Sequence, residues 1–397
     1  MRVTFYTLGC KVNQNETGAL AQLFEENGYT VVSNEEGADV YIVNSCTVTN
    51  FGDQKSRKWL RRAKRENPGA VTVLTGCYPQ AFPEEAAEIA EADVVTGSGN
   101  RHAILADVQK VLNGEEERVV DIRPHEKGER FEELPMDKFA EHTRAFVKVE
   151  DGCNRRCAYC VIPRARGPVR SRDEASVLEE LRRLSDAGYK EVVLTAISLP
   201  SYGTDSGTSL VELIEKAAEV PGIERIRLGS LDPDMLHDED ILRMAGVKKL
   251  CPQFHLSLQS GCDKTLRAMR RPYTTAQYAD IAAKLREAFG AEKVSFTTDV
   301  IVGFPGETEE DFEASMAFVT GMQFLKVHVF PYSRREGTAA YDFPGQVPEH
   351  EKESRSRRMT AAVEEVRAAE VTAMQGRTAS VLLETPLSNT LFTGYTK

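Results

Sequence analysis

The sequence contains no apolar run that approaches the roughly 20 residues of a membrane-spanning helix. Its first residues, MRVTFYTLGC, also lack the charged region and long apolar core of a secretory signal peptide. Low-complexity composition is absent as well, since hydrophobic residues make up 41% and charged residues 28% of the chain. These absences predict a globular protein without a membrane partner that stays in the cytoplasm.

Disulfides are not expected in that reducing compartment. The eight cysteines are therefore predicted to be metal ligands or catalytic thiols where they cluster. A chain of 397 residues is also too long for one small core, so two or three domains are expected.

The formal net charge of −11 does not by itself exclude a nucleic-acid partner, because binding depends on local patches. Two basic patches occur, KSRKWLRRAKR at 55–65 and RARGPVRSR at 164–172. For the first patch a solvated helix face is the commoner explanation, and contact with a polyanion is the alternative.

Short β-rich runs alternate with helical patterns at the start of the chain, with strands expected at 2–8, 39–43 and 71–75. Alternation of this kind predicts a parallel sheet covered by helices on both faces. We assign residues 1–122 to this N-terminal α/β domain. Residues 123–143, which are charged and lack apolar periodicity, are predicted to be a linker.

A second α/β series follows, with six candidate strands at 145–149, 191–197, 225–230, 254–258, 294–302 and 326–330. Six βα units predict a (β/α)6 partial TIM barrel over 144–348, with its chemistry at the carboxyl ends of the strands. A helical connection is expected at 349–376. Residues 377–397 hold two β-rich runs, which cannot form a stable domain alone and so predict an incomplete β-domain.

Three cysteines, Cys153, Cys157 and Cys160, lie in the segment GCNRRCAYC directly after the first barrel strand. A structural zinc site needs four closed ligands, and the segment offers no fourth Cys or His. Three thiolates on a cubane iron-sulfur cluster instead leave one iron open to another ligand. The pattern favours such a cluster, with zinc or unrelated buried thiols as the alternative.

Three further cysteines, Cys10, Cys46 and Cys77, each follow one of the predicted N-terminal strands. Adjacent parallel strands end at the same edge of a sheet, so these thiols are predicted to converge into a second open cluster site. Buried packing of small thiols is the alternative. Cys251 and Cys262 belong to neither trio and are expected to be structural.

The CxxxCxxC spacing resembles the signature of the radical S-adenosylmethionine enzymes. With the separated N-terminal cysteines and the C-terminal β-segment, nearly the whole chain is similar to the methylthiotransferases. The resemblance implies two 4Fe-4S clusters and S-adenosylmethionine, whose sulfonium is cleaved to a 5′-deoxyadenosyl radical at the catalytic cluster of Cys153, Cys157 and Cys160. The second cluster supplies or holds the sulfur. A TRAM-like RNA-binding β-domain is implied too, with tRNA affinity reduced in a chain ending at Lys397.

Several motifs are most similar to one branch of that family: GCKVNQNET, NSCTVTNFGDQKSR, CVIPRARGPVRSR and HVFPYSRREGT. That branch acts on tRNA and converts C2–H of N6-threonylcarbamoyladenosine, next to the anticodon, into C2–SCH3. It implies an electron donor such as flavodoxin or ferredoxin and a sulfur source as partners. The alternatives are the branches for isopentenyladenosine in tRNA or for an aspartate of a ribosomal protein, and a non-catalytic iron-sulfur or zinc protein that binds tRNA.

Four arginines beside the radical motif are candidate substrate contacts, for RNA phosphates or for the threonylcarbamoyl carboxylate: Arg164, Arg166, Arg170 and Arg172. Pairing with Asp173, Glu174 or other acids is the alternative. The resemblance further implies cofactor contacts at barrel strand ends. These candidates are Tyr159, Ser230, Asp232, Gln259 and Asp299.

Overall fold

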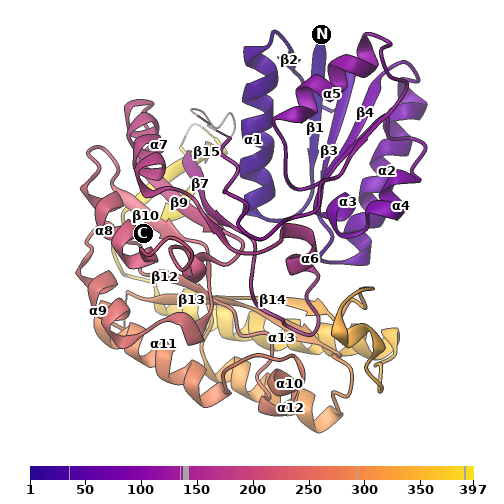
Figure 1. The fold of residues 1–397 in the computed structure, drawn as a ribbon. Helices are drawn as coiled ribbons and strands as arrows, with labels where there is room; N and C mark the ends of the chain where they lie inside the picture. Colours follow the sequence, from indigo (N-terminus) through magenta and orange to yellow (C-terminus); the bar gives the residue numbers. More distant parts are fainter. Residues whose placement is uncertain (35, 135, 137–142, 292, 389) are drawn as a thin grey trace.

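The computed structural model describes the chain except for residues 35, 135, 137–142, 292 and 389. Figure 1 shows two α/β units, an N-terminal one whose last strand is β6 (Val119–Asp121) and a barrel unit whose first strand is β7 (Arg144–Asp151). The described residues between Ile122 and Thr143 form no helix or strand, and Gln80, Ser98 and Arg101 hold parts of this segment by hydrogen bonds. Across the described part of the chain, no helix combines the length and apolarity needed to cross a membrane.

The N-terminal unit is a parallel sheet in the order β2-β1-β3-β4-β5-β6. Its strands are β1 (Arg2–Thr7), β2 (Thr30–Val31), β3 (Val40–Ser45), β4 (Val71–Gly76), β5 (Val94–Thr96) and β6 (Val119–Asp121). Its helices are α1 (Lys11–Glu26), α2 (Asn50–Glu66), α3 (Cys77–Ala81), α4 (Pro83–Ala87) and α5 (Ala103–Leu112). The three strands that the sequence predicts are β1, β3 and β4, at the centre of the sheet.

Both faces of this sheet are buried, which explains its nearly continuous apolar strands. Ile42 and Val73 pack in one cluster with Leu20 and Phe24 of α1, while the next residue of β4, Leu74, packs in another with residues of α2 and α3. The alternation of side chains along each strand therefore separates two cores.

The barrel unit contains two four-stranded sheets, β10-β9-β7-β8 and β11-β12-β13-β14. The strands are β7 (Arg144–Asp151), β8 (Arg170–Ser171), β9 (Glu191–Ala196), β10 (Arg225–Leu228), β11 (Ser230–Leu231), β12 (Gln253–Leu256), β13 (Ser295–Val302) and β14 (Lys326–Pro331). The helices are α6 (Ile162–Arg166), α7 (Glu174–Asp186), α8 (Leu210–Glu219), α9 (Asp238–Gly246), α10 (Asp263–Ala268), α11 (Thr275–Phe289) and α12 (Glu309–Gly321).

One predicted strand, 225–230, is divided at Gly229 into β10, which pairs with β9, and β11, which pairs with β12. This division links the two sheets, so six parallel strand positions follow one another from β7 to β14. The arrangement agrees with the partial barrel expected from six βα units. Short β8 is the exception, because it runs antiparallel to β7.

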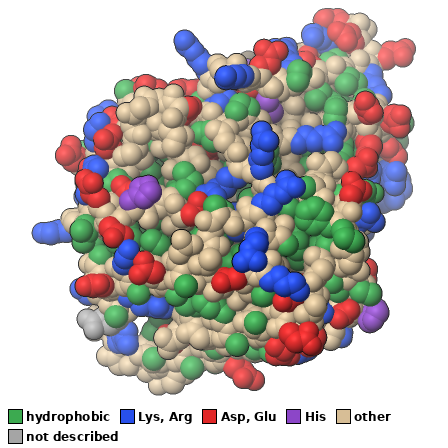
Figure 2. All heavy atoms as spheres, turned by 60° about the horizontal axis from the view of Figure 1, so that its bottom comes forward, with side chains coloured by type: hydrophobic (Ala, Val, Ile, Leu, Met, Phe, Trp, Pro, Cys, Tyr) green, Lys and Arg blue, Asp and Glu red, His purple; other side chains and the backbone are tan. Residues whose placement is uncertain are grey.

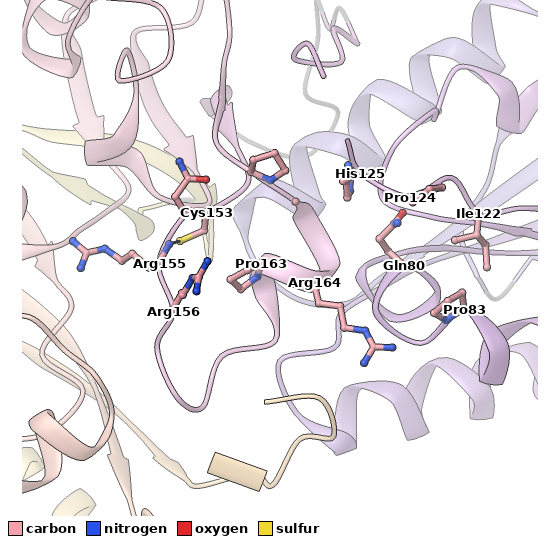
Figure 3. Close-up of a pocket in the computed structure, with 13 residues that line it drawn as sticks. Gln80, Pro83, Ile122, Pro124, His125, Cys153, Arg155, Arg156, Pro163 and Arg164 are labelled. Atoms are coloured by element: carbon pink, nitrogen blue, oxygen red, sulfur yellow. Dashed lines mark hydrogen bonds between the residues drawn. The ribbon is translucent and has the colours of Figure 1, made fainter. Parts of the chain in front are cut away.

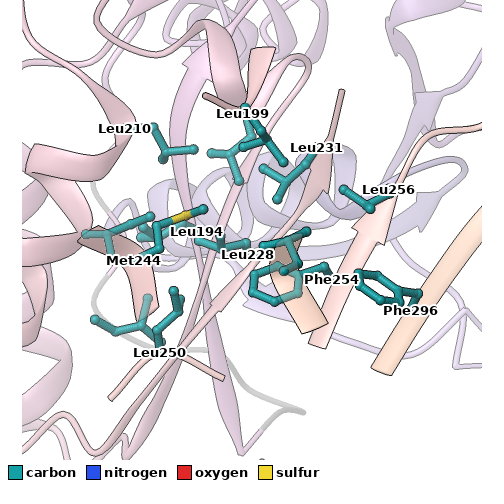
Figure 4. Packing of buried hydrophobic residues seen from close by; sticks show 14 of the residues in the cluster. Leu194, Leu199, Leu210, Leu228, Leu231, Met244, Leu250, Phe254, Leu256 and Phe296 are labelled. Atoms are coloured by element: carbon teal, nitrogen blue, oxygen red, sulfur yellow. The ribbon is translucent and has the colours of Figure 1, made fainter. Parts of the chain in front are cut away.

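One apolar cluster fills the layer between the barrel strands and the helices outside them. Leu194 of β9, Leu228 of β10 and Leu256 of β12 are each almost completely buried in it. Figure 4 shows these side chains together with Phe254, also of β12, and Phe296 of β13. This packed core fixes the strand ends that carry the radical motif.

The last elements are α13 (Glu349–Ala373) and an antiparallel hairpin of β15 (Val381–Pro386) and β16 (Phe392–Thr396). The hairpin lies against the amino-terminal ends of barrel strands. Arg225 at the start of β10 donates to the carbonyl oxygen of Tyr395 at 2.9 Å, and the Arg144 guanidinium lies 3.2 Å from the centre of the Tyr395 ring. The hairpin is therefore at the end of the barrel opposite the radical motif. The domain boundaries stay predictions.

Charge is distributed unevenly over the surface. Figure 2 shows one face on which Lys and Arg side chains lie near one another across the middle, although the chain carries a net charge of −11. Local positive potential can therefore coexist with a net negative protein.

Candidate cluster sites between the two units

The radical motif occupies the loop that follows β7. Gly152 begins this loop with φ of +89°, and a side chain there would place its Cβ 1.9 Å from the carbonyl oxygen of Pro168. Only glycine fits that approach. The loop is then anchored from two directions, since the Ala158 amide donates to Met269 at 2.9 Å and the Ala340 amide donates to the carbonyl oxygen of Ala158 at 2.8 Å.

The thiols of this loop lie in a partly polar environment. Arg271 donates to the sulfur of Cys157 at 3.3 Å and also pairs with Asp232. Burial raises the pKa of Cys153 to about 11 and the pKa of Cys160 to about 12, with repulsion from neighbouring thiolates adding to the effect. A bound cation would reverse this preference for the neutral thiol.

The second trio comes from three neighbouring strands. Cys10 precedes α1 after β1, Cys46 follows β3, and Cys77 is the first residue of α3 after β4. Because β1, β3 and β4 are adjacent and parallel, their carboxyl ends share one edge of the sheet. At that edge a Cβ on Gly9 would lie 3.2 Å from the Cys46 sulfur, so the first two loops are in contact.

Arg166 of α6 connects the remaining thiols of this trio. Its Nε donates to the Cys77 sulfur at 3.1 Å and its Nη2 donates to Oδ1 of Asn13 at 2.9 Å. The same Asn13 oxygen accepts from the Cys10 thiol at 3.4 Å. Burial raises the pKa of Cys77 to about 12, and the guanidinium charge of Arg166 opposes that rise.

Both trios have a donor set that suits an iron-sulfur cluster. Each offers three thiols that follow the carboxyl ends of strands, with a guanidinium hydrogen-bonded to one sulfur. Hydrogen bonds to cluster sulfurs are a known means of tuning such sites. No three His, Cys, Asp or Glu side chains of the described residues are arranged to hold a metal ion by themselves. That the six thiols bind two clusters stays a proposal.

A buried ion-pair network holds Arg166 in place. Its guanidinium pairs with Glu16 of α1 and lies 3.3 Å from Asp151 at the end of β7. Lys148 bridges the same two carboxylates at 2.7 and 2.6 Å. Burial alone would raise the pKa of Glu16, but the charges of Arg101, Arg166 and Lys148 lower it to about 2. The network joins the N-terminal unit to the barrel, and through Arg166 it contacts Cys77.

The four arginines expected to contact substrate separate into two groups. Arg164 is exposed, whereas Arg166, Arg170 and Arg172 are at most 5% exposed. Arg170 donates to the carbonyl oxygens of Arg166 and Pro168, and Arg172 pairs with Glu180. For the three buried arginines the structure therefore shows the alternative, pairing with acids and backbone. Contact with substrate stays a prediction for Arg164.

The cofactor candidates lie at the same barrel end but in different environments. Asp232 is the most closely tied to the radical loop, because it pairs with Arg271 and lies 3.4 Å from Arg155. Tyr159 packs on a small apolar cluster with Ala158 and Met269, and burial raises its pKa.

The other three candidates lie on β11, just after β12, and on β13. Ser230 is exposed and in register with His255, whose ring lies 3.3 Å from Asp299. Gln259 adopts φ of +71° and exchanges backbone hydrogen bonds with Asp299 and Ile301. Whether these residues bind S-adenosylmethionine stays a prediction.

A pocket of about 780 Å³ lies beside the radical loop. Figure 3 shows Cys153 and Arg156 on one side, Gln80 and Pro83 of the N-terminal unit on the other, and Arg164 reaching between them. The volume is in the range of pockets that enclose small molecules. The pocket is thus an open cleft formed jointly by both units, and Cys153 lies in its wall.

Three residues near the cysteines were missed by sequence reasoning. Arg271 contacts Cys157, Glu150 accepts from the Ser198 amide at 2.8 Å, and Arg335 pairs with Asp53 at 2.7 Å. Glu150 lies two residues before GCNRRCAYC, and Arg335 lies within HVFPYSRREGT. The position of each beside motif residues was therefore a usable signal. Arg271 lies 114 positions from Cys157, the thiol that it contacts, and offered no such signal.

Comparison with known sequences gives matches over both units. Residues 147–319 match the radical SAM superfamily, and residues 2–97 match an uncharacterized protein family, UPF0004. The threonylcarbamoyladenosine tRNA methylthiotransferase MtaB of Bacillus subtilis (strain 168) is 40% identical over 400 residues, covering 99% of this chain and 88% of that protein. The tRNA-2-methylthio-N(6)-dimethylallyladenosine synthase of Clostridium novyi (strain NT) is 35% identical over 391 residues, covering 96% and 85%.

Solved structures agree on the fold. The radical S-adenosylmethionine methyltransferase TsrM from Kitasatospora setae superposes with a TM-score of 0.61 at 14% identity, covering 85% of this chain and 73% of that one. At that identity the likeness concerns architecture alone. The sequence relatives carry the assignment: the chain belongs to the radical SAM methylthiotransferase family, whose cofactors are 4Fe-4S clusters and S-adenosylmethionine.

Proposed function

We propose that this enzyme acts on tRNA and replaces the C2 hydrogen of N6-threonylcarbamoyladenosine, next to the anticodon, with a methylthio group. The observation that supports it most is the junction between the two cysteine trios. Helix α6, which begins two residues after Cys160, packs on α3, which begins at Cys77, through Val161 and Ala165. One short helix therefore connects a candidate radical site to a candidate sulfur site.

In this proposal Cys153, Cys157 and Cys160 hold the cluster that binds S-adenosylmethionine, and Cys10, Cys46 and Cys77 hold the second. When bound, these groups supply the radical that removes hydrogen from carbon and the sulfur and methyl that replace it. The chain's own residues orient the sites: Arg271 fixes Cys157, and Arg166 fixes Cys77. Tyr159, Ser230, Asp232, Gln259 and Asp299 are the proposed cofactor contacts.

The substrate branch rests on similarity to named relatives, in particular those of Bacillus subtilis and Aquifex aeolicus (strain VF5), both named for threonylcarbamoyladenosine in tRNA. A dimethylallyladenosine enzyme is the second candidate, because the Clostridium novyi relative is 35% identical. An electron donor such as flavodoxin or ferredoxin and a sulfur source complete the proposal.

Mass spectrometry of tRNA nucleosides separates these candidates. We expect cells that lack the gene to lose the methylthio group from threonylcarbamoyladenosine, and the wild-type gene to restore it. Loss from the isopentenyl or dimethylallyl nucleoside instead would assign the second branch. Restoration by a Cys153→Ala gene would contradict catalysis by the radical motif.

A further inference from the structure

Two exposed arginines, Arg156 and Arg164, line the pocket, and two more, Arg270 and Arg334, lie on loops that contact the radical loop and Arg164. None of the four pairs with an acidic side chain of the described residues. Arg164 instead lies 5.2 Å from the centre of the Phe82 ring, and Arg334 lies 4.2 Å from that of Tyr341. We name these four residues the arginine rim.

Contacts between loops bring the members of the rim together. Arg156 and Arg164 line the same pocket. Arg270 directly follows Met269, whose carbonyl oxygen accepts from the Ala158 amide of the radical loop. On the other side, a Cβ on Gly337 would lie 2.5 Å from Nη1 of Arg164, which brings the loop of Arg334 next to that side chain.

The rim arginines differ from the buried arginines in having no internal carboxylate partner. The charges of Arg166 and Arg172 are neutralised by Glu16 and Glu180, so they offer little attraction to an external anion. A guanidinium without an internal carboxylate keeps its positive potential and its planar fork, which matches phosphate in two hydrogen bonds. Glu336 lies on the loop of Arg334 and is the opposing charge closest in sequence.

An exposed aromatic ring extends the same surface. Phe51 is 62% exposed at the start of α2, and the Lys55 ammonium lies 4.5 Å from the centre of its ring. Its neighbour Asn50 donates to the carbonyl oxygen of Arg334 at 3.1 Å. A ring with an adjacent cation is a typical stacking platform for an unpaired base, whereas an acidic peptide gains nothing from it.

We propose that the arginine rim binds the backbone phosphates of a single-stranded RNA loop while one nucleotide of that loop turns into the pocket and a flanking base stacks on Phe51. The inference rests on the proposed function for the identity of the RNA. It assigns the phosphate contacts to Arg156, Arg164, Arg270 and Arg334, in place of the buried Arg166, Arg170 and Arg172.

The test measures binding of an unmodified anticodon stem-loop RNA to the anaerobically reconstituted holoenzyme at several salt concentrations. Each phosphate contact on a single strand contributes about 0.7 to the slope of log K against log salt. The variant Arg156→Gln/Arg164→Gln/Arg270→Gln is therefore expected to lower the slope by about 2 and to weaken binding roughly tenfold or more. Phe51→Ala should weaken binding and leave the slope unchanged.

Arg182→Gln, an exposed arginine on the outer helix α7, is the matched control and should bind like the wild type. Iron content of each variant reports whether the clusters are intact. Unchanged slope and affinity in the triple variant would contradict phosphate binding by the arginine rim. Competition by polyglutamate as strong as that by RNA would contradict it too. If RNA binding depends on the arginine rim but no methylthiolated product forms, the proposed function is contradicted while RNA binding by the rim is supported.

Discussion

The two cysteine trios are assembled in different ways. Cys153, Cys157 and Cys160 lie on one loop of the barrel unit, and their arginine, Arg271, comes from the same unit. Cys10, Cys46 and Cys77 come from three strands of the N-terminal unit, and their arginine, Arg166, comes from the barrel. The barrel trio is therefore complete within its own unit, whereas the N-terminal trio depends on docking between the units.

Because of that difference, removal of one cysteine from each trio should affect S-adenosylmethionine cleavage and product formation differently. These are the largest effects expected. Cys153→Ala should abolish both reductive cleavage of S-adenosylmethionine and product formation. Cys77→Ala should abolish the methylthio product while cleavage continues, since the barrel trio does not need it. Chromatography of 5′-deoxyadenosine and of tRNA nucleosides measures both, and each variant should lose about half of the iron.

Cys262→Ala provides the control for this pair. Cys262 lies outside both trios and donates to Asp311 at 3.6 Å. The iron content and the activity of the Cys262→Ala variant should match those of the wild type. Loss of cleavage in Cys77→Ala with a full barrel cluster would show that the trios do not act separately.

Substitution of Arg166 and of Arg271 should lower the free energy of unfolding by different amounts. Arg166→Met leaves Glu16 and Asp151 buried with fewer positive partners, a change expected to cost about 3 to 5 kcal/mol in the free energy of unfolding. Arg271→Met should cost less, because Asp232 keeps its contact with Arg155. Urea denaturation measures both values, and an equal cost would contradict the view that only the N-terminal trio relies on a network between the units.

Sequence patterns predicted the main strands and the positions of the cysteines, but not the arginines and carboxylates that pair around them. Cys10, Cys46 and Cys77 could be placed at one edge because parallel strands share their direction, a property that the apolar runs reveal. Four arginines in RARGPVRSR could not be sorted into exposed and buried ones, because burial of Arg166 depends on Glu16, which lies 150 positions away in the chain. Short β2, β5, β6 and β8 were missed for a related reason, since two or three residues carry no periodicity of their own.

Acid should weaken the same network in a defined range of pH. The folded protein holds the pKa of Glu16 at about 2, below its ordinary value of 4.5. A lowered carboxyl pKa stabilises the fold fully above the unfolded value, and this contribution is lost as pH falls from about 4.5 towards 2. The contribution is at most about 3 kcal/mol. Unfolding measured across this range should depend less on pH in Glu16→Gln than in the wild type, and parallel curves would assign the acid sensitivity elsewhere.

The smallest expected effect concerns the loop that carries Cys46. Arg335, 3% exposed, donates to Thr47 at 2.6 Å and pairs with Asp53 at 2.7 Å, so a barrel residue restrains a loop of the N-terminal unit. Arg335→Lys keeps the charge near Asp53 but lacks the planar fork that reaches Thr47 as well. We expect faster amide hydrogen exchange at residues 46–53, unchanged exchange at residues 153–160, and a loss of no more than about 1 kcal/mol in global stability. Equal acceleration in both loops would mean that the barrel trio also depends on docking between the units.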